Sequence, residues 1–143
     1  MRKRLRYVAL TGTLASAWLG GCGPNDEFLH VGVAGKVTLD GSPLTGAAIT
    51  FQPLASGAAA HGTVEAGAYS IARSEGPGPG AYRVEISKTA PTGRRIPDSE
   101  YSGQTIEETR NAIPSRYNIN SELKVDVKPD VDQTFDFDLK SKK

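Results

Sequence analysis

Residues 31–53 read VGVAGKVTLDGSPLTGAAITFQP, and this stretch decides the fold class of the chain. Its first half carries apolar residues at every second or fourth position, as a β-strand with one buried face does. These residues are Val31, Val33, Val37 and Leu39. The run ends because Gly41 can adopt a positive φ and Pro43 has no N–H for a ladder. A second apolar run, residues 47–51, stops at Pro53. The pattern predicts a β-hairpin on which later strands stack.

Five more short runs after residue 60 can form strands, and turn residues separate them. The runs are 61–64, 68–72, 81–88, 123–127 and 135–139. Together with the first two runs they predict seven strands, which is typical of an all-β sandwich. The inward faces of the strands are expected to supply a core of Val37, Ile49, Phe51, Val84, Ile86, Val125, Phe135 and Phe137.

Two segments interrupt this pattern. Residues 74–80, SEGPGPG, predict a loop, because neither a helix nor a central strand tolerates this sequence. Residues 89–112 are the least regular part of the chain, since Pro91, Gly93 and Pro97 break any period. An insertion of this length is functional or mobile, and a mobile loop is favoured here, with one helical turn over residues 106–110.

The N-terminus has the three parts of a bacterial secretory signal. Residues 1–6 are basic, residues 7–19 are mostly apolar but short for a membrane span, and Leu19, Gly20, Gly21 and Cys22 follow. The last four resemble a lipobox, where small residues admit the peptidase and the thiol accepts a diacylglyceryl group. This predicts a cleaved signal peptide (1–21) and acylated Cys22; the alternative is an ordinary exported protein with an unpaired thiol. A tether (22–29), a β-sandwich domain (30–140) and a polar tail (141–143) then follow.

Charge and cysteine content exclude some classes of partner and bond. The chain has 17 basic and 16 acidic residues, and four of the basic ones, Arg2, Lys3, Arg4 and Arg6, lie in the predicted signal. Removing those four leaves 13 basic against 16 acidic side chains, a net charge of −3. No basic stripe remains for a nucleic acid. The only cysteine, Cys22, leaves no partner for an intrachain disulfide.

No candidate catalytic residue, metal ligand or cofactor site emerges from the motifs. His30 and His61 lack the spaced ligands that a zinc site needs, so surface histidine is the favoured interpretation. Ser70 and Ser87 lie outside any Gly-x-Ser-x-Gly elbow. The glycine-rich loop lacks the following helix of a phosphate cradle. The basic pair Arg94-Arg95 could meet an acidic polymer, but a solvated loop is the favoured interpretation.

Carboxylates concentrate near the C-terminus, at Asp126, Asp130, Asp132, Asp136 and Asp138. Calcium would need several of these oxygens to converge on one point. Asp136 and Asp138 share a strand face about 7 Å apart, which does not close such a shell. Alternating aspartates on an outward face also prevent a terminal strand from pairing with other chains. This second interpretation is favoured over calcium binding.

Several motifs together resemble a known group of proteins. VAGKVTLDGSPLTGAAITFQP, then GAY, PGAYRVEISK, IPSRYN and FDFDL are similar to small lipoproteins abundant in planctomycete bacteria. These are described as carboxypeptidase regulatory-like or transthyretin-like domain proteins. The resemblance implies a single seven-stranded Greek-key β-sandwich of the prealbumin (transthyretin) type. Residues 65–69, EAGAY, shift the spacing of the DxxGxY turn common in that group.

The combined expectation is a cell-envelope lipoprotein anchored in a membrane by acyl chains such as palmitate on Cys22. Its function would be non-enzymatic, as a binding or scaffolding module for an envelope protein or a glycan. The alternatives are a structural spacer and a transthyretin-like hydrolase. Hydrolases of that architecture place a histidine and an arginine in one cleft and end in Tyr-Arg-Gly-Ser, whereas this chain ends in Lys-Ser-Lys-Lys.

Overall fold

The structure, a computed structural model, describes residues 29–142 and is built of β-strands without an α-helix in that range. The strands are β1 (Val33–Leu39), β2 (Ser42–Pro43), β3 (Ala47–Pro53), β4 (Ala60–Val64), β5 (Ala68–Ile71), β6 (Gly80–Ser87), β7 (Thr89–Pro97), β8 (Thr105–Asn111), β9 (Lys124–Val127), β10 (Gln133–Thr134) and β11 (Phe137–Leu139). Two 3₁₀ turns are η1 (Arg73–Glu75) and η2 (Ser115–Tyr117). The all-β prediction is confirmed, although η1 begins the segment that was expected to be a plain loop.

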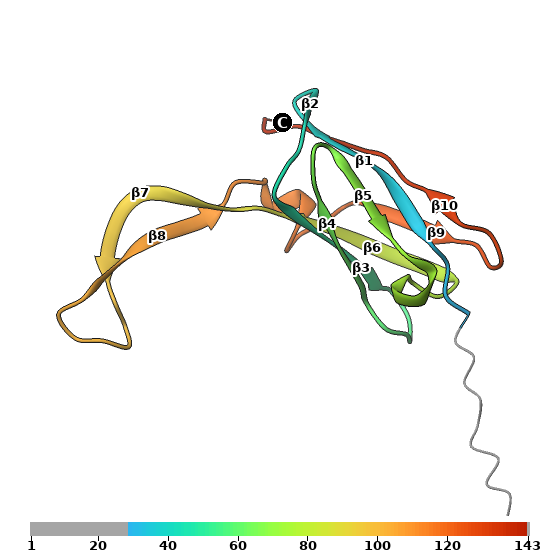
Figure 1. Cartoon of the computed structure of the whole chain (residues 1–143), viewed down its shortest axis with the longest axis horizontal. Coiled ribbons are helices and arrows are strands. Elements are labelled where there is room, and N and C mark those ends of the chain that lie inside the picture. Colours follow the sequence, from blue (N-terminus) through green and yellow to red (C-terminus); the bar gives the residue numbers. More distant parts are fainter. Residues whose placement is uncertain (1–28, 143) are drawn as a thin grey trace, which may run out of the picture.

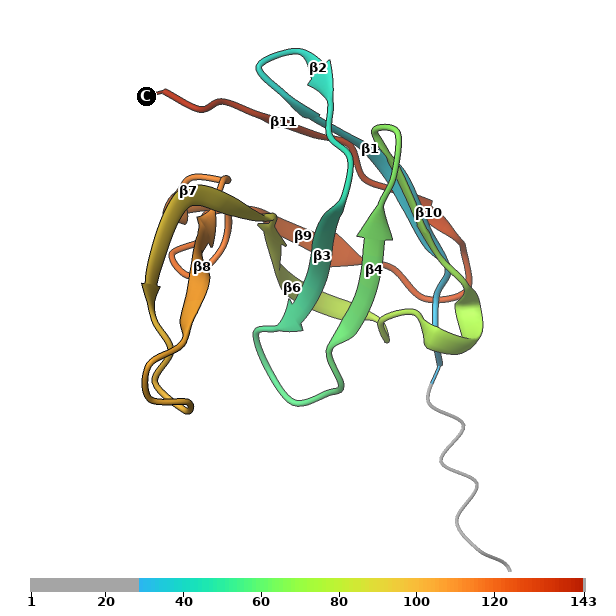
Figure 2. The ribbon, with the colours of Figure 1, turned by 60° about the vertical axis from the view of Figure 1, so that its left-hand side comes forward.

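Two sheets face each other across one core (Figures 1 and 2). In the first, β1 is central: it pairs in parallel with β10 and β11 on one side and antiparallel with β2 and β5 on the other. The second sheet has the antiparallel order β4-β3-β6-β9. The first and last strands of the domain therefore lie side by side in one sheet.

The hairpin predicted over residues 31–53 is wrong, because β1 and β3 lie in different sheets. Only the short β2 folds back on β1, across a turn in which Gly41 has φ +81°. The chain then crosses to the other sheet: Leu44 N–H donates to the Val37 carbonyl, and Gly46 N–H donates to the Val64 carbonyl. Both apolar runs bury one face, but they bury it from opposite sides of the core.

The core lies between the two sheets and contains six of the eight residues predicted for it. Val37, Ile49, Phe51, Val84, Ile86 and Phe137 are buried. Val125 and Phe135 are only partly buried, which corrects the prediction. Val125 lies on β9, at the edge of its sheet, and Phe135 lies in the gap between β10 and β11. Both positions therefore have neighbours on fewer sides.

Residues 89–112, predicted as a mobile loop with a helical turn at 106–110, instead form the antiparallel strands β7 and β8. We call residues 89–111 the arm. Figure 1 shows it extending away from the two sheets. Its threonines and isoleucines favour extended backbone. No local alternation predicted it, because no residue of β7 or β8 is buried.

Candidate functional site

The residues predicted to carry the anchor, Leu19, Gly20, Gly21 and Cys22, lie outside the described range. Leu29 is the first described residue and marks where the chain from Cys22 reaches the domain. Within residues 29–142, no helix is long and apolar enough to span a bilayer.

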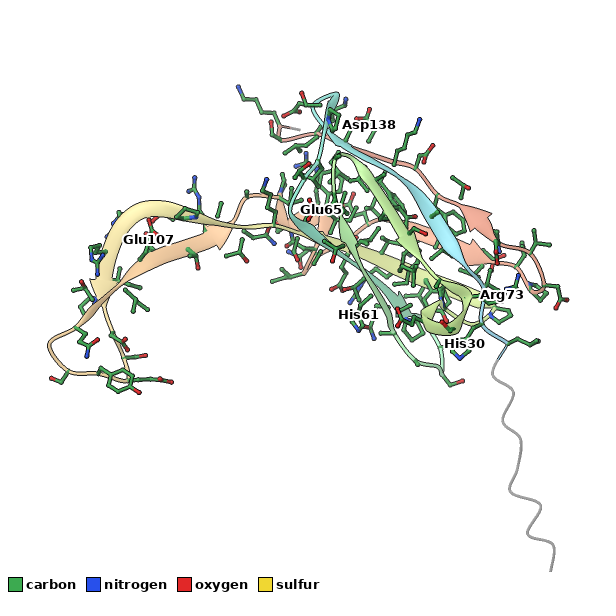
Figure 3. The ribbon with its side chains drawn as sticks, viewed as in Figure 1. His30, His61, Glu65, Arg73, Glu107 and Asp138 are labelled. Atoms are coloured by element: carbon green, nitrogen blue, oxygen red, sulfur yellow. The ribbon has the colours of Figure 1, made fainter. Side chains whose placement is uncertain are left out.

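Three loops gather around the point where the chain enters the sandwich. Val31 N–H donates to the Pro77 carbonyl at 2.9 Å. The Asp132 carboxylate accepts Gly32 N–H at 3.0 Å. We call this region, made of residues 29–32, 54–59, 72–79 and 128–132, the proximal end. Figure 3 shows His30 and Arg73 at this end and Asp138 at the opposite one.

A groove of about 780 Å³ opens at the proximal end between the loops 54–59 and 76–79. Its lining residues are Leu29, His30, Ser56, Gly57, Ala58, Gly76, Gly78, Pro79 and Tyr82. Gly76 allows the close packing behind it, since a Cβ there would lie 2.0 Å from the Val31 carbonyl oxygen. The groove is therefore built on a loop that is packed tightly against the incoming chain.

Three polar side chains, His30, Ser56 and Tyr82, line this groove. His30 Nδ1 lies 2.7 Å from the Gly76 carbonyl oxygen. A carbonyl only accepts hydrogen bonds, so Nδ1 is the donor and Nε2 remains for another partner. Burial raises the pKa of the Tyr82 phenol, and a main-chain hydrogen bond from Gly78 opposes the shift. The lining includes no carboxylate that could orient the histidine, as general acid–base catalysis would favour.

The second histidine belongs to a different surface. His61 is exposed on β4, and its Nδ1 lies 3.1 Å from the Thr50 hydroxyl of β3. The structure therefore gives each histidine its own hydrogen-bond partner. Between residues 29 and 142, no three histidine, cysteine or acidic side chains are placed to hold a metal ion.

The C-terminal aspartates join the last strands to β1. Besides Asp132 with Gly32, Asp136 accepts Lys36 N–H at 2.7 Å and Asp138 accepts the Thr38 hydroxyl at 2.7 Å. The Thr38 hydrogen bond is the main cause that lowers the pKa of Asp138. Asp136 reinforces the ladder in the gap between β10 and β11, whereas Asp132 acts just before β10 and Asp138 within β11. Sequence reasoning missed them, because each partner lies 100 residues away.

The arm is held firmly at its base. Asn111 Oδ1 accepts both Lys88 N–H and Ile113 N–H, each at 3.0 Å. Ile113 is buried in the core, so the returning strand is tied to the domain. Beyond this base, β7 and β8 pair only with each other. Both outer edges and both faces of the arm therefore face solvent.

The two outer edges of the arm differ in their capacity to pair. Pro91 and Pro97 lie in β7, and its register with β8 is irregular between Pro91 and Arg95. Proline has no N–H to donate, so this edge resists further strand pairing. The sequence of β8, TIEETRN, contains neither proline nor glycine. The edge of β8 is therefore the one available to an additional strand.

The direction of the main-chain groups along β8 follows from its base. Ala112 N–H donates to the Lys88 carbonyl at 2.7 Å. Main-chain N–H and C=O groups alternate in direction along a strand. Those of Arg110 therefore point toward β7, and those of Thr109 point away from β7 to the free edge. Pro91 pairs with Thr109, and the next cross-strand pair is Arg95 with Glu107. Between these two pairs β7 moves on by four residues and β8 by only two. The irregularity thus lies in β7, and the alternation along β8 continues unbroken.

Comparison with protein-family models, with curated proteins and with solved structures found no match to this chain.

Proposed function

We propose that this chain is a lipoprotein of the cell envelope, anchored through acylated Cys22, whose domain presents the arm to a protein partner. In this proposal the domain is a seven-stranded Greek-key sandwich of the prealbumin type. Its strands are β1, β3, β4, β5, β6, β9 and the pair β10–β11. The arm is an insertion between β6 and β9. The protein is then a non-enzymatic binding or scaffolding module.

The free edge of β8 is the observation that carries this proposal. An extended peptide can add to such an edge through main-chain hydrogen bonds, while alternate side chains supply specificity. A rigid base and an exposed, two-stranded body suit this mode of binding, because a two-stranded hairpin gains stability from a third strand. A glycan would instead use exposed aromatic faces, and Tyr101 is the only aromatic among the exposed large apolar residues of the described chain.

The anchor is tested separately from the arm. Cys22→Ser replaces the thiol that accepts the diacylglyceryl group with a hydroxyl. We expect the wild type to incorporate labelled palmitate and partition into detergent, and the variant to do neither. Three acyl chains at about 0.8 kcal/mol per buried methylene make release of the wild type negligible. The anchor would be refuted if the wild type took up no label and Cys22→Ser stayed with the membrane as well as the wild type does.

The arm is tested with two substitutions at one position. Thr109→Pro removes the outward N–H of β8 and leaves its inward groups in place, whereas Thr109→Val keeps that N–H. A photo-reactive amino acid at Glu107 is activated in intact envelopes for each variant. We expect a crosslinked product with wild type and Thr109→Val, and its loss with Thr109→Pro. A product that persists in Thr109→Pro would show that the partner does not add to the edge of β8. No product with any variant would favour the structural spacer.

The hydrolase alternative has one observation in its favour, which is the groove that holds His30 and Tyr82. Against it, the groove lining contains neither an arginine nor a carboxylate. The binding module is therefore the proposal that the geometry supports better.

A further inference from the structure

We infer that the proximal end rests directly on the phospholipid bilayer, with Leu29, Leu54 and Val131 placed among the lipid headgroups. This inference builds on the proposed anchor at Cys22 and adds an orientation of the domain. The protein surface itself then makes a second contact with the membrane, besides the acylated Cys22.

Three large apolar side chains are exposed at this end. The exposed fractions are 57% for Leu29, 51% for Leu54 and 62% for Val131. Single exposed apolar residues are common on protein surfaces, so their number alone indicates nothing. Their placement does, because they come from three separate segments that meet where the chain enters the domain.

Hydrogen bonds establish that the three segments share one end. Val131 precedes Asp132, whose carboxylate accepts Gly32 N–H three residues after Leu29. Leu54 N–H donates to the Ala81 carbonyl at 3.0 Å, at the start of β6. Residues 56–58, which follow Leu54, line the same groove as Leu29. Figures 1 and 3 show these loops around the point where the chain enters.

The length of the connecting chain identifies the bilayer as the occupant of this surface. Six residues, 23–28, separate Leu29 from the predicted acylated cysteine, Cys22. The chain from Cys22 to Leu29 therefore spans about 25 Å at most when fully extended. The proximal end is thereby held near the headgroups, and exposed leucine and valine side chains gain by leaving water there.

Charge at the proximal end is largely balanced within the protein. Arg73 pairs with Asp132 at 2.7 Å, and Lys128 pairs with Asp126. Glu75 and Asp130 add acidic groups to the same loops. No cluster of basic side chains therefore draws this end toward anionic lipid, and the contact is apolar. We expect it to form on a neutral phosphatidylcholine surface.

Tryptophan fluorescence can test the orientation without background. The only tryptophan, Trp18, lies in the predicted signal peptide and is removed on maturation. Single tryptophans are introduced by Leu29→Trp, Leu54→Trp and Val131→Trp in the full-length, lipidated protein. The matched control is Ile119→Trp, which is also an exposed apolar position, with 74% exposure. Ile119 follows η2, where the Tyr117 hydroxyl accepts Lys140 N–H beyond the far end of β11.

The proteins are reconstituted into phosphatidylcholine vesicles, with or without bromine on the acyl chains. We expect blue-shifted emission for the three proximal tryptophans, and loss of that emission with brominated lipid. The Ile119→Trp emission should stay red-shifted and unquenched. Circular dichroism of each variant checks that the fold is kept.

The possible failures are distinguishable. If the variants do not float with the vesicles, or Trp18 emission persists in the wild type, the proposed anchor and this inference both fail. If they float but fewer than two of the three proximal tryptophans are quenched, the anchor stands and the orientation is wrong. Quenching of Ile119→Trp as strong as at the proximal sites also overturns the orientation.

Discussion

Gly35 of β1 packs so closely against Phe135 that a Cβ atom on Gly35 would lie 2.0 Å from the Phe135 carbonyl oxygen. The same carbonyl accepts the Tyr69 hydroxyl at 2.8 Å. Phe135 N–H in turn donates to the Ala34 carbonyl at 2.9 Å. The first strand, β5 and the link between β10 and β11 therefore meet at a contact that only glycine permits.

We expect Gly35→Ala to lower the free energy of unfolding by about 3 kcal/mol, because the new methyl group must displace main chain. Urea denaturation of the soluble domain measures this. Gly41→Ala is the control: its Cβ would meet nothing within 4 Å, and the positive φ costs about 1 kcal/mol. Equal losses at the two positions would show that the contact at Gly35 is not tight.

Phe51 is the centre of the aromatic core. Its side chain is fully buried, and its ring centroid lies 6.1 Å from that of Tyr69 and 6.3 Å from that of Phe135. Phe51→Ala should cost about 3–5 kcal/mol. Phe135→Ala should cost less, since Phe135 is only partly buried. A larger loss for Phe135→Ala in urea melts would mean that the two sheets pack differently.

Tyr69 should make the domain sensitive to alkali. Burial, assisted by the nearby charge of Asp136, raises the pKa of the Tyr69 phenol far above its ordinary value of 10.0. The folded state holds this proton more tightly than the unfolded chain. The stabilising contribution is therefore complete below pH 10 and decreases as the pH rises beyond it.

Unfolding free energies between pH 8 and pH 12 test this, with tyrosinate absorbance recorded in parallel. We expect Tyr69→Phe to lose stability at neutral pH, because the Phe135 carbonyl loses its donor, and to show a shallower alkaline decline. Tyr82 retains part of the slope, since burial raises its pKa too. The prediction fails if Tyr69→Phe and wild type decline in parallel.

The arm should be removable without unfolding the domain. No residue of β7 or β8 is buried, so replacing residues 90–110 with Asn-Gly loses no core contact. We expect an unchanged urea midpoint. Asn111→Ala is the contrasting variant, because it deprives Lys88 N–H and Ile113 N–H of their acceptor and should cost about 1–3 kcal/mol. A large loss on removing the arm would show that it supports the sandwich.

The purified soluble domain should not turn over ureide, ester or glycoside substrates. The groove offers His30 and Tyr82 but no orienting carboxylate, and His61 is exposed with only Thr50 as its partner. Activity assays with wild type, His30→Ala and His61→Ala decide the matter. Turnover that disappears in either variant, with its fold intact, would replace the binding module with an enzyme.

Sequence alone determined the features that local patterns encode. Alternation identified most strands, such as residues 81–88, and most of the core, because a strand like β6 buries every second side chain. The signal for acylation at Cys22 is local in the same sense and stays a prediction. Such patterns report which face of a strand is buried, whatever covers that face.

Only the tertiary structure decided what covers each face. β1 and β3 both bury one side, and that pattern is the same for a hairpin and for two opposed sheets. The arm had no readable period, because neither of its faces is buried and its pairing rests on main-chain groups that every residue carries. The aspartates meet β1, and Leu29, Leu54 and Val131 share one end, through contacts between distant segments. Such contacts exist only once the sheets have packed.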